Sequence, residues 1–217
     1  MMEFWLYLHI LLLVFWVGTD LGVFLAARYS ERSNLSIQTR QTVLELGMKL
    51  DRLPRTALVL IIPSGIMLAH SSGMEIVAKT QVAGVWIAAV VWLGILWLGF
   101  LSSNPQVRAR SAALNWWFNL LAALITLFWA WWLYAGSDLP AWIIFKVMIV
   151  GCVFVAGFLL DFLFGPAMGV FSQIEESSDN EDLNKRYSKA LAPVYWVVLL
   201  IYVLTLGAAA AGIFKFG

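Results

Sequence analysis

The chain has 217 residues, of which 62% are hydrophobic and only 12% are charged. Soluble domains carry roughly 25% charged residues, so this composition excludes a water-soluble globular protein. A formal net charge of +1 without a basic arm excludes a nucleic-acid partner, and a single cysteine excludes an internal disulfide. The composition instead predicts an all-α, polytopic bundle of transmembrane helices, with the lipid bilayer as its surroundings.

Six apolar segments approach the length of about 20 residues that a membrane-spanning helix needs. The predicted spans cover residues 4–27, 54–69, 82–101, 113–135, 141–164 and 191–214. They leave no room for a soluble domain, so we expect a single transmembrane domain over residues 1–217. Asp51 and Pro54 before the second span are typical of an N-cap and a first helical turn.

Basic residues are distributed unequally between the loops on the two sides of the membrane. Eleven of the 14 Lys and Arg residues lie in or beside the loops that follow the first, third and fifth spans. Only Lys79 and Lys215 lie on the opposite side of the membrane. By the positive-inside rule, the basic loops are cytoplasmic. We therefore expect a multi-pass protein of the cell inner (plasma) membrane with both termini on the non-cytoplasmic side.

The two longest cytoplasmic loops are each predicted to contain a short amphipathic helix. In residues 35–50, Ile37, Leu44 and Met48 share one helical face, and Arg40 lies away from it. Residues 179–190 begin with acids and end with bases, an order that complements the helix dipole. The acids are Asp179, Glu181 and Asp182, and the bases are Lys185, Arg186 and Lys189.

Ionisable residues inside the spans are the first candidates for function, because burying them in lipid is unfavourable. They are His9, Asp20, Arg55, His70, Lys146 and Asp161. At about 1.5 Å per helical residue, both histidines and Lys146 fall in one layer near the outer surface. His9, Trp16 and Asp20 recur at intervals of seven and four residues, so they share a stripe of the first helix.

Two imidazoles at one depth, on consecutive antiparallel helices, suit the axial positions of a haem b better than a zinc site. In this interpretation His9 and His70 ligate the iron, Lys146 meets a propionate, and Trp142 and Trp16 belong to the cofactor site. The alternative is that each imidazole hydrogen-bonds a polar neighbour and that Lys146 snorkels to the surface. For the inner layer we predict structural pairing of Asp20 and Asp161 with Arg52 or Arg55.

Several of these residues lie in short motifs that resemble the HemJ-type protoporphyrinogen oxidases and the related CopD-like membrane proteins. The motifs are Leu8-His9-Ile10 with Phe15-Trp16-Val17-Gly18, the Pro63-Ser64-Gly65 element, and Trp142 followed by Phe145-Lys146. The resemblance covers about residues 4–75 and 140–212. It implies a haem b bound by His9, Lys146 as a functional, catalytic base, and a protoporphyrinogen-oxidase-like oxidoreductase. Two spans lie between the matching parts, and His70 has no counterpart in the resemblance.

The sequence thus favours a membrane-embedded b-type haem protein that acts in electron transfer or in the oxidation of a porphyrin or quinone. One alternative is a cofactor-free subunit or assembly factor that packs against other membrane subunits or forms a homo-oligomer. Another is a transporter of a small solute or of copper, although copper sites favour Met and Cys ligands in tight motifs.

Overall fold

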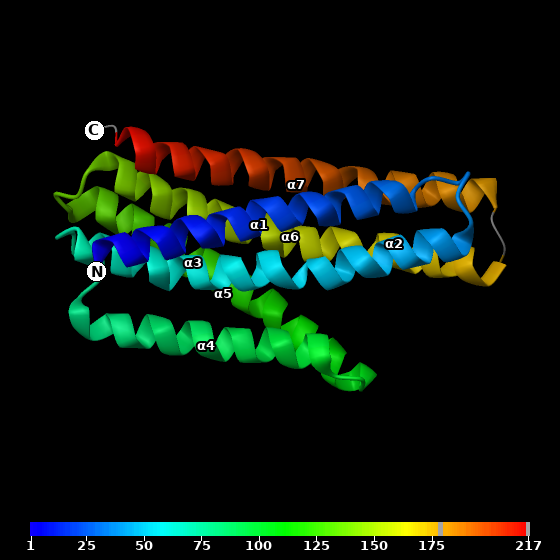
Figure 1. Ribbon diagram of the computed structural model, residues 1–217, viewed down its shortest axis with the longest axis horizontal. Coiled ribbons are helices and arrows are strands. Elements are labelled where there is room, and N and C mark those ends of the chain that lie inside the picture. The colour runs from blue at the N-terminus through cyan, green and yellow to red at the C-terminus, as the bar shows by residue number, and fades with distance from the viewer. Residues whose placement is uncertain (178–179, 216–217) are drawn as a thin grey trace. The chain divides into compact units, whose positions relative to one another are not determined.

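The computed structural model describes residues 1–177 and 180–215, and every regular element within these ranges is an α-helix. The predicted all-α class is therefore confirmed. In chain order the helices are α1 (Met2–Ser30), α2 (Ile37–Leu50), α3 (Arg52–Ser71), α4 (Lys79–Leu101), α5 (Pro105–Gly136), α6 (Ala141–Ser177) and α7 (Glu181–Phe214) (Figure 1).

Within the described residues, six helical segments are long and apolar enough to cross a membrane, with α2 and α3 counted together as Ile37–Ser71. The chain is a multi-pass membrane protein. Several helices are longer than their predicted spans. The 37 residues of α6 extend about 55 Å at 1.5 Å per residue, whereas a hydrocarbon core is about 30 Å thick.

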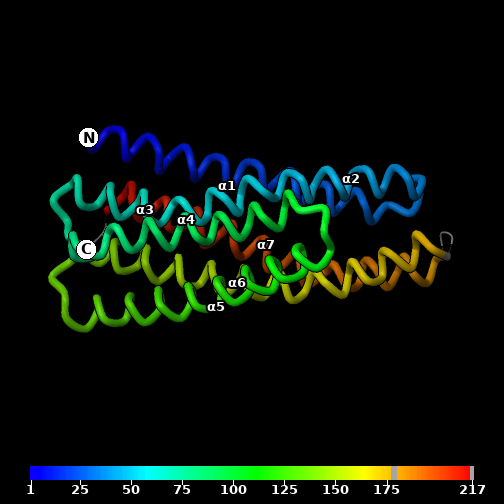
Figure 2. Tube along the Cα trace, turned by 90° about the horizontal axis from the view of Figure 1, so that it is seen from below, coloured from blue at the N-terminus to red at the C-terminus, as the bar shows by residue number. Residues whose placement is uncertain are grey.

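The chain divides into two compact units, and three helices run from one unit into the other. The first unit comprises residues 1–26 and 45–115, and the second comprises residues 27–44 and those from 116 onward. In the first unit α3 packs against α4, which follows it in the antiparallel direction (Figure 2). The buried apolar residues include Ala57, Ile61 and Ile66 of α3 and Trp92 and Leu96 of α4.

The second unit is built on the antiparallel pair α6 and α7, which lie side by side (Figures 1 and 2). Phe154 of α6 and Leu191 of α7 are completely buried. Gly207 of α7 lies at the contact with α6, where a Cβ would be at an ordinary van der Waals distance of 3.7 Å from the Cδ1 of Ile149. Small residues at such contacts are the usual means by which membrane helices pack.

The segment predicted as a separate amphipathic helix at 179–190 differs in the structure. Asp179 lies outside the described residues, and residues 181–190 form the first turns of the continuous helix α7. The side chain of Asn180 accepts a hydrogen bond from the backbone N–H of Asp182 and so caps the helix. The helix continues without a break from this polar start into the apolar part. Pro193 lies within the helix without ending it.

Helix α2 is present, but of the predicted face Ile37, Leu44 and Met48 only Leu44 is buried. Arg40 is 0% and Leu44 6% exposed, whereas Met48 is 47% exposed. Gly47 continues the buried face, since a Cβ there would lie 2.7 Å from the Cβ of Ala26. The apolar residues of α2 alone therefore predict its buried face only in part, because the long side chain of Arg40 is buried as well.

Candidate functional site

The imidazole of His9, on α1, packs against the Pro63-Ser64-Gly65 element of α3. Its Nδ1 lies 3.1 Å from the Oγ of Ser64. A Cβ added to Gly65 would lie 3.0 Å from the Cε1 of the ring, closer than a carbon–carbon contact of about 3.5–4.0 Å. The absence of a side chain at Gly65 therefore makes room for the ring. We call His9, Ser64 and Gly65 the imidazole seat.

Ser64 is held in place by its own helix. It is completely buried, and its hydroxyl donates to the carbonyl oxygen of Ile61 at 3.0 Å. Pro63 lies inside α3, where it lacks the N–H that would continue the helical bonding pattern. The Pro63-Ser64-Gly65 element therefore combines a locally altered helix, a buried hydroxyl and an open backbone surface at one position, and the ring of His9 lies against it.

His70 is anchored to the loop that follows α3. Helix α3 ends at Ser71, and Ser72 is its C-cap. Gly73 follows with a left-handed φ of +81°, which suits the position just after a C-cap. The chain then returns so that the Nε2 of His70 lies 2.8 Å from the carbonyl oxygen of Val77. This hydrogen bond corresponds to the alternative in which a histidine bonds a polar neighbour. The role of His70 as an iron ligand stays a prediction.

His9 of α1 contacts α3 at a different level from that of His70. The ring of His9 meets Ser64 and Gly65, which precede His70 by six and five residues. At about 1.5 Å per residue, these positions are about 8–9 Å apart along the helix. The prediction that both histidines share one layer was made by counting residues from the ends of the spans. Such a count does not show how far one helix is shifted along its neighbour.

Near Asp51, the inner charged residues make contacts that the sequence did not indicate. The Nε of Arg55 donates to the carboxylate of Asp51 at 2.6 Å. Asp51 is the N-cap residue of α3, as predicted, but its side chain makes no capping hydrogen bond to the backbone of the helix. Pairing of Asp20 and Asp161 with Arg52 or Arg55 stays a prediction. Both acids are half-buried.

Arg52 belongs to a chain of hydrogen bonds that joins α3 to α4. Its guanidinium donates to the carbonyl oxygen of Phe100 at 3.3 Å, near the C-terminus of α4, where the helix dipole favours a positive charge. The indole of Trp97 donates to the hydroxyl of Thr56 at 3.2 Å, and that hydroxyl donates to the carbonyl oxygen of Arg52 at 2.7 Å. We call Trp97, Thr56, Arg52 and Phe100 the α3–α4 clamp.

Lys146 and Trp142 come together in the second unit, as their spacing on α6 predicts. The Nζ of Lys146 lies 5.9 Å from the centroid of the Trp142 ring, a cation–π contact. The side chain reaches Gly212 of α7, where a Cβ would lie 2.7 Å from the Nζ. Lys146 therefore lies close to the C-terminal end of α7. Its side chain is half-buried. Trp16, the remaining predicted site residue, is a buried residue of α1.

The second unit also has a buried polar cluster that the sequence analysis missed. Its members are Ser30, Arg40, Phe171 and Tyr187. The Nε of Arg40 donates to the carbonyl oxygen of Ser30 at 2.7 Å, and the hydroxyls of Ser30 and Tyr187 are 2.7 Å apart. The guanidinium lies over the ring of Phe171, 5.7 Å from its centroid. Periodicity had placed Arg40 on the polar face of α2, so it gave no signal of burial.

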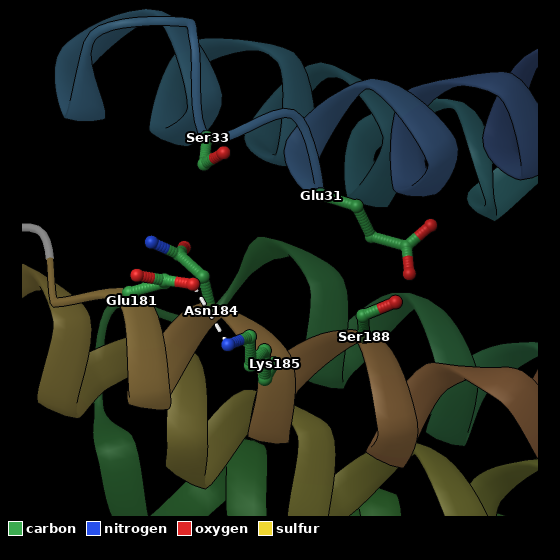
Figure 3. A pocket seen from close by; sticks show the side chains of 6 residues that line it. All are labelled: Glu31, Ser33, Glu181, Asn184, Lys185 and Ser188. Carbon is green, nitrogen blue, oxygen red and sulfur yellow. Dashed lines mark ion pairs between the residues drawn. The ribbon is translucent and has the colours of Figure 1, made fainter.

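A pocket of about 460 Å³ opens beside this cluster, between the chain after α1 and the first turns of α7 (Figure 3). Its lining residues are Glu31, Ser33, Glu181, Asn184, Lys185 and Ser188. Both carboxylates have partners. Glu181 pairs with Lys185 at 2.7 Å, and Glu31 accepts from Arg28 at 3.1 Å and from the hydroxyl of Tyr195 at 2.8 Å. None of the predicted site residues lines this pocket.

Within residues 1–177 and 180–215, no group of three or more His, Cys, Asp or Glu side chains is arranged to hold a metal ion. A haem iron does not need such a group, because it takes only one or two ligands from the protein. Comparisons of the chain with models of protein families, with curated proteins and with solved structures found no match.

Proposed function

We propose that the chain is a membrane-embedded b-type haem protein that binds iron through His9 and acts in electron transfer or in the oxidation of a porphyrin or quinone. The observation that carries the proposal is the imidazole seat, in which α3 supplies a hydroxyl partner and an open backbone surface to the ring of His9. Ionisable residues inside membrane spans are rare and usually functional, and this one is specifically positioned.

The donor set of the seat fits a haem, whose iron His9 would bind. Because Ser64 engages Nδ1, Nε2 is the nitrogen through which His9 would bind iron, with the hydroxyl orienting the ring from the other side. When bound, the haem would supply one-electron chemistry, and burial by the chain would tune its potential. His70 fits less well, because its Nε2 already bonds the carbonyl oxygen of Val77. The proposal therefore rests on His9.

We also propose the orientation and the membrane that the base distribution favours. Eleven bases near one set of helix ends, against two on the other side, support a cytoplasmic position for those ends and an outer position for both termini. In this arrangement α2 and the polar start of α7 lie at the cytoplasmic surface of the inner membrane. Lys146 and Trp142 lie toward the outer surface, and their roles as residues of the cofactor site stay predictions.

An absorption spectrum of the protein purified from haem-replete cells tests the function. The wild type should show a Soret band and, after reduction, the alpha band of a b-type haem. His9→Ala should lose most of the haem, whereas the matched His70→Ala variant should retain it. A wild type without a Soret band would contradict the proposal and favour a cofactor-free subunit or a transporter. Full retention of haem by His9→Ala would move the ligand elsewhere.

A further inference from the structure

The hydroxyl of Ser64 has only one proton to give, and its position shows where that proton goes. The hydroxyl donates to the carbonyl oxygen of Ile61 at 3.0 Å, and a carbonyl oxygen can only accept. Toward His9, whose Nδ1 is 3.1 Å away, the same oxygen must then act as the acceptor. Both hydrogen bonds are satisfied together only if the Nδ1 of His9 carries a proton.

The partner of His70 imposes the opposite condition. The Nε2 of His70 lies 2.8 Å from the carbonyl oxygen of Val77. Since the carbonyl has no proton to give, this nitrogen must be the donor. A neutral His70 therefore carries its proton on Nε2, whereas a neutral His9 carries it on Nδ1.

We infer that Ser64 is a positioning residue that holds His9 with its proton on Nδ1 and its lone pair on Nε2, the reverse of the tautomer held at His70. The inference rests on the proposed function only where the lone pair is assigned to haem iron. The tautomer itself follows from the hydrogen bonds. Ser64 acts through His9, in the way that residues behind a metal-bound histidine fix its tautomer and ring orientation.

Gly65 and Ser64 contribute differently to the position of the His9 ring. Because Gly65 has no side chain, the imidazole can lie against the backbone of α3. A Cβ at this position would be only 3.0 Å from the Cε1 of the ring. Ser64 then determines which nitrogen faces the helix. Loss of such a supporting partner typically lowers metal affinity by about 10–100-fold, so Ser64 should matter for haem affinity without touching the iron.

Nitrogen-15 NMR of the haem-free, histidine-labelled protein tests the tautomers directly. The chain has two histidines, so His70→Gln assigns the signals of His9. In spectra of the neutral imidazoles, recorded at about pH 8, His9 should show a protonated Nδ1 and an unprotonated Nε2. His70 should show the reverse. A wild-type His9 protonated on Nε2 would overturn the inference.

Substitutions at Ser64 show whether the hydroxyl is the cause. Ser64→Ala should abolish the preference of His9 for Nδ1–H, and Ser64→Thr should restore it by returning a hydroxyl. Ser71→Ala is the matched control, because Ser71 donates to the carbonyl oxygen three residues before it at 2.8 Å, as Ser64 does, but has no bond to His9. An unchanged His9 spectrum in folded Ser64→Ala protein would overturn the inference, whether or not the Thr variant folds.

Haem titration of the same variants separates this inference from the proposed function. Ser64→Ala should weaken haem binding by about 10–100-fold relative to the wild type and to Ser71→Ala. If the NMR result is as expected but the wild type binds no haem, the positioning role stands and the proposed function fails. If haem binds through His9 but Ser64→Ala leaves both tautomer and affinity unchanged, the positioning role fails and the proposed function stands.

Discussion

Arg40 donates from its Nε to the carbonyl oxygen of Ser30 at 2.7 Å, although its side chain is completely buried. The hydroxyl of Ser30 donates to the carbonyl oxygen of Ala27 at 2.7 Å and so accepts from the hydroxyl of Tyr187. One serine thus fastens α2 and α7 to the end of α1. Tyr187 is 157 residues from Ser30 in the sequence, and all of these residues lie in the second unit.

Tyr187→Phe should destabilise the protein by about 1 kcal/mol, because one buried hydrogen bond is lost while the ring stays in place. Thermal unfolding in detergent, followed by tryptophan fluorescence, measures the change. Tyr29→Phe is the matched control, since Tyr29 is 43% exposed and lies next to the same serine. Equal melting temperatures for the wild type and Tyr187→Phe would show that the bond contributes nothing to stability.

Gly47→Ala should destabilise the protein by about 1–3 kcal/mol through overpacking. The new Cβ would lie 2.7 Å from the Cβ of Ala26, which has no rotatable bond to move it away. Gly84→Ala is the control, because nothing lies within 4 Å of a Cβ at that position, and it should not lower the melting temperature. Similar effects of the two substitutions would contradict the close approach of α1 and α2.

Thr56→Val should cost about 1–3 kcal/mol, because it keeps the shape of the side chain but leaves the indole N–H of Trp97 without its acceptor. Trp97→Phe together with Thr56→Val should cost less than the sum of the two single changes, which a double-mutant cycle detects. Thr42→Val is a matched control. Thr42 bonds the carbonyl oxygen of Gln38 in the same way, at 2.8 Å, on an exposed face. Strict additivity would exclude the α3–α4 clamp.

Reporter fusions should establish the topology. Fusions at Asn34, Gln106 and Asn180 should give cytoplasmic signals, and fusions at Gly73 and Gly136 should give external ones, because the bases favour the cytoplasmic side. Alkaline phosphatase and green fluorescent protein report opposite sides and check each other. A strong external signal at Asn34 or Asn180 would reverse the proposed orientation.

The sequence predicted the helices well because a bilayer leaves few alternatives. Backbone groups in lipid must bond within their own helix, so long apolar segments become helices. The ends of those helices were harder to predict, as α6 illustrates. Its predicted span ended at residue 164, whereas the helix continues to Ser177 through Gly165 and Pro166. Hydropathy predicts which residues lie in the lipid, but it does not predict where the helix ends, because a helix can continue into water.

The candidate site was only partly predictable. Spacing placed His9 on one stripe of the first helix, together with Trp16 and Asp20. The partner that engages His9 is Ser64, which no periodicity distinguishes from other serines in a helix. The shift of α1 along α3 depends on side-chain packing at Gly65. Such packing between distant segments leaves no local pattern in a single sequence.

The burial of Arg40 has a consequence for biosynthesis. In the proposed orientation, the insertion machinery would meet this segment before α6 and α7 are made, and Arg40 would then count among the basic charges that keep the loop cytoplasmic. Once α6 arrives, the same group lies over the ring of Phe171 and bonds the backbone of Ser30. One residue would thus act twice, first as a topological signal and later as part of the interior. Arg40→Met should then affect membrane orientation and stability as two separable defects.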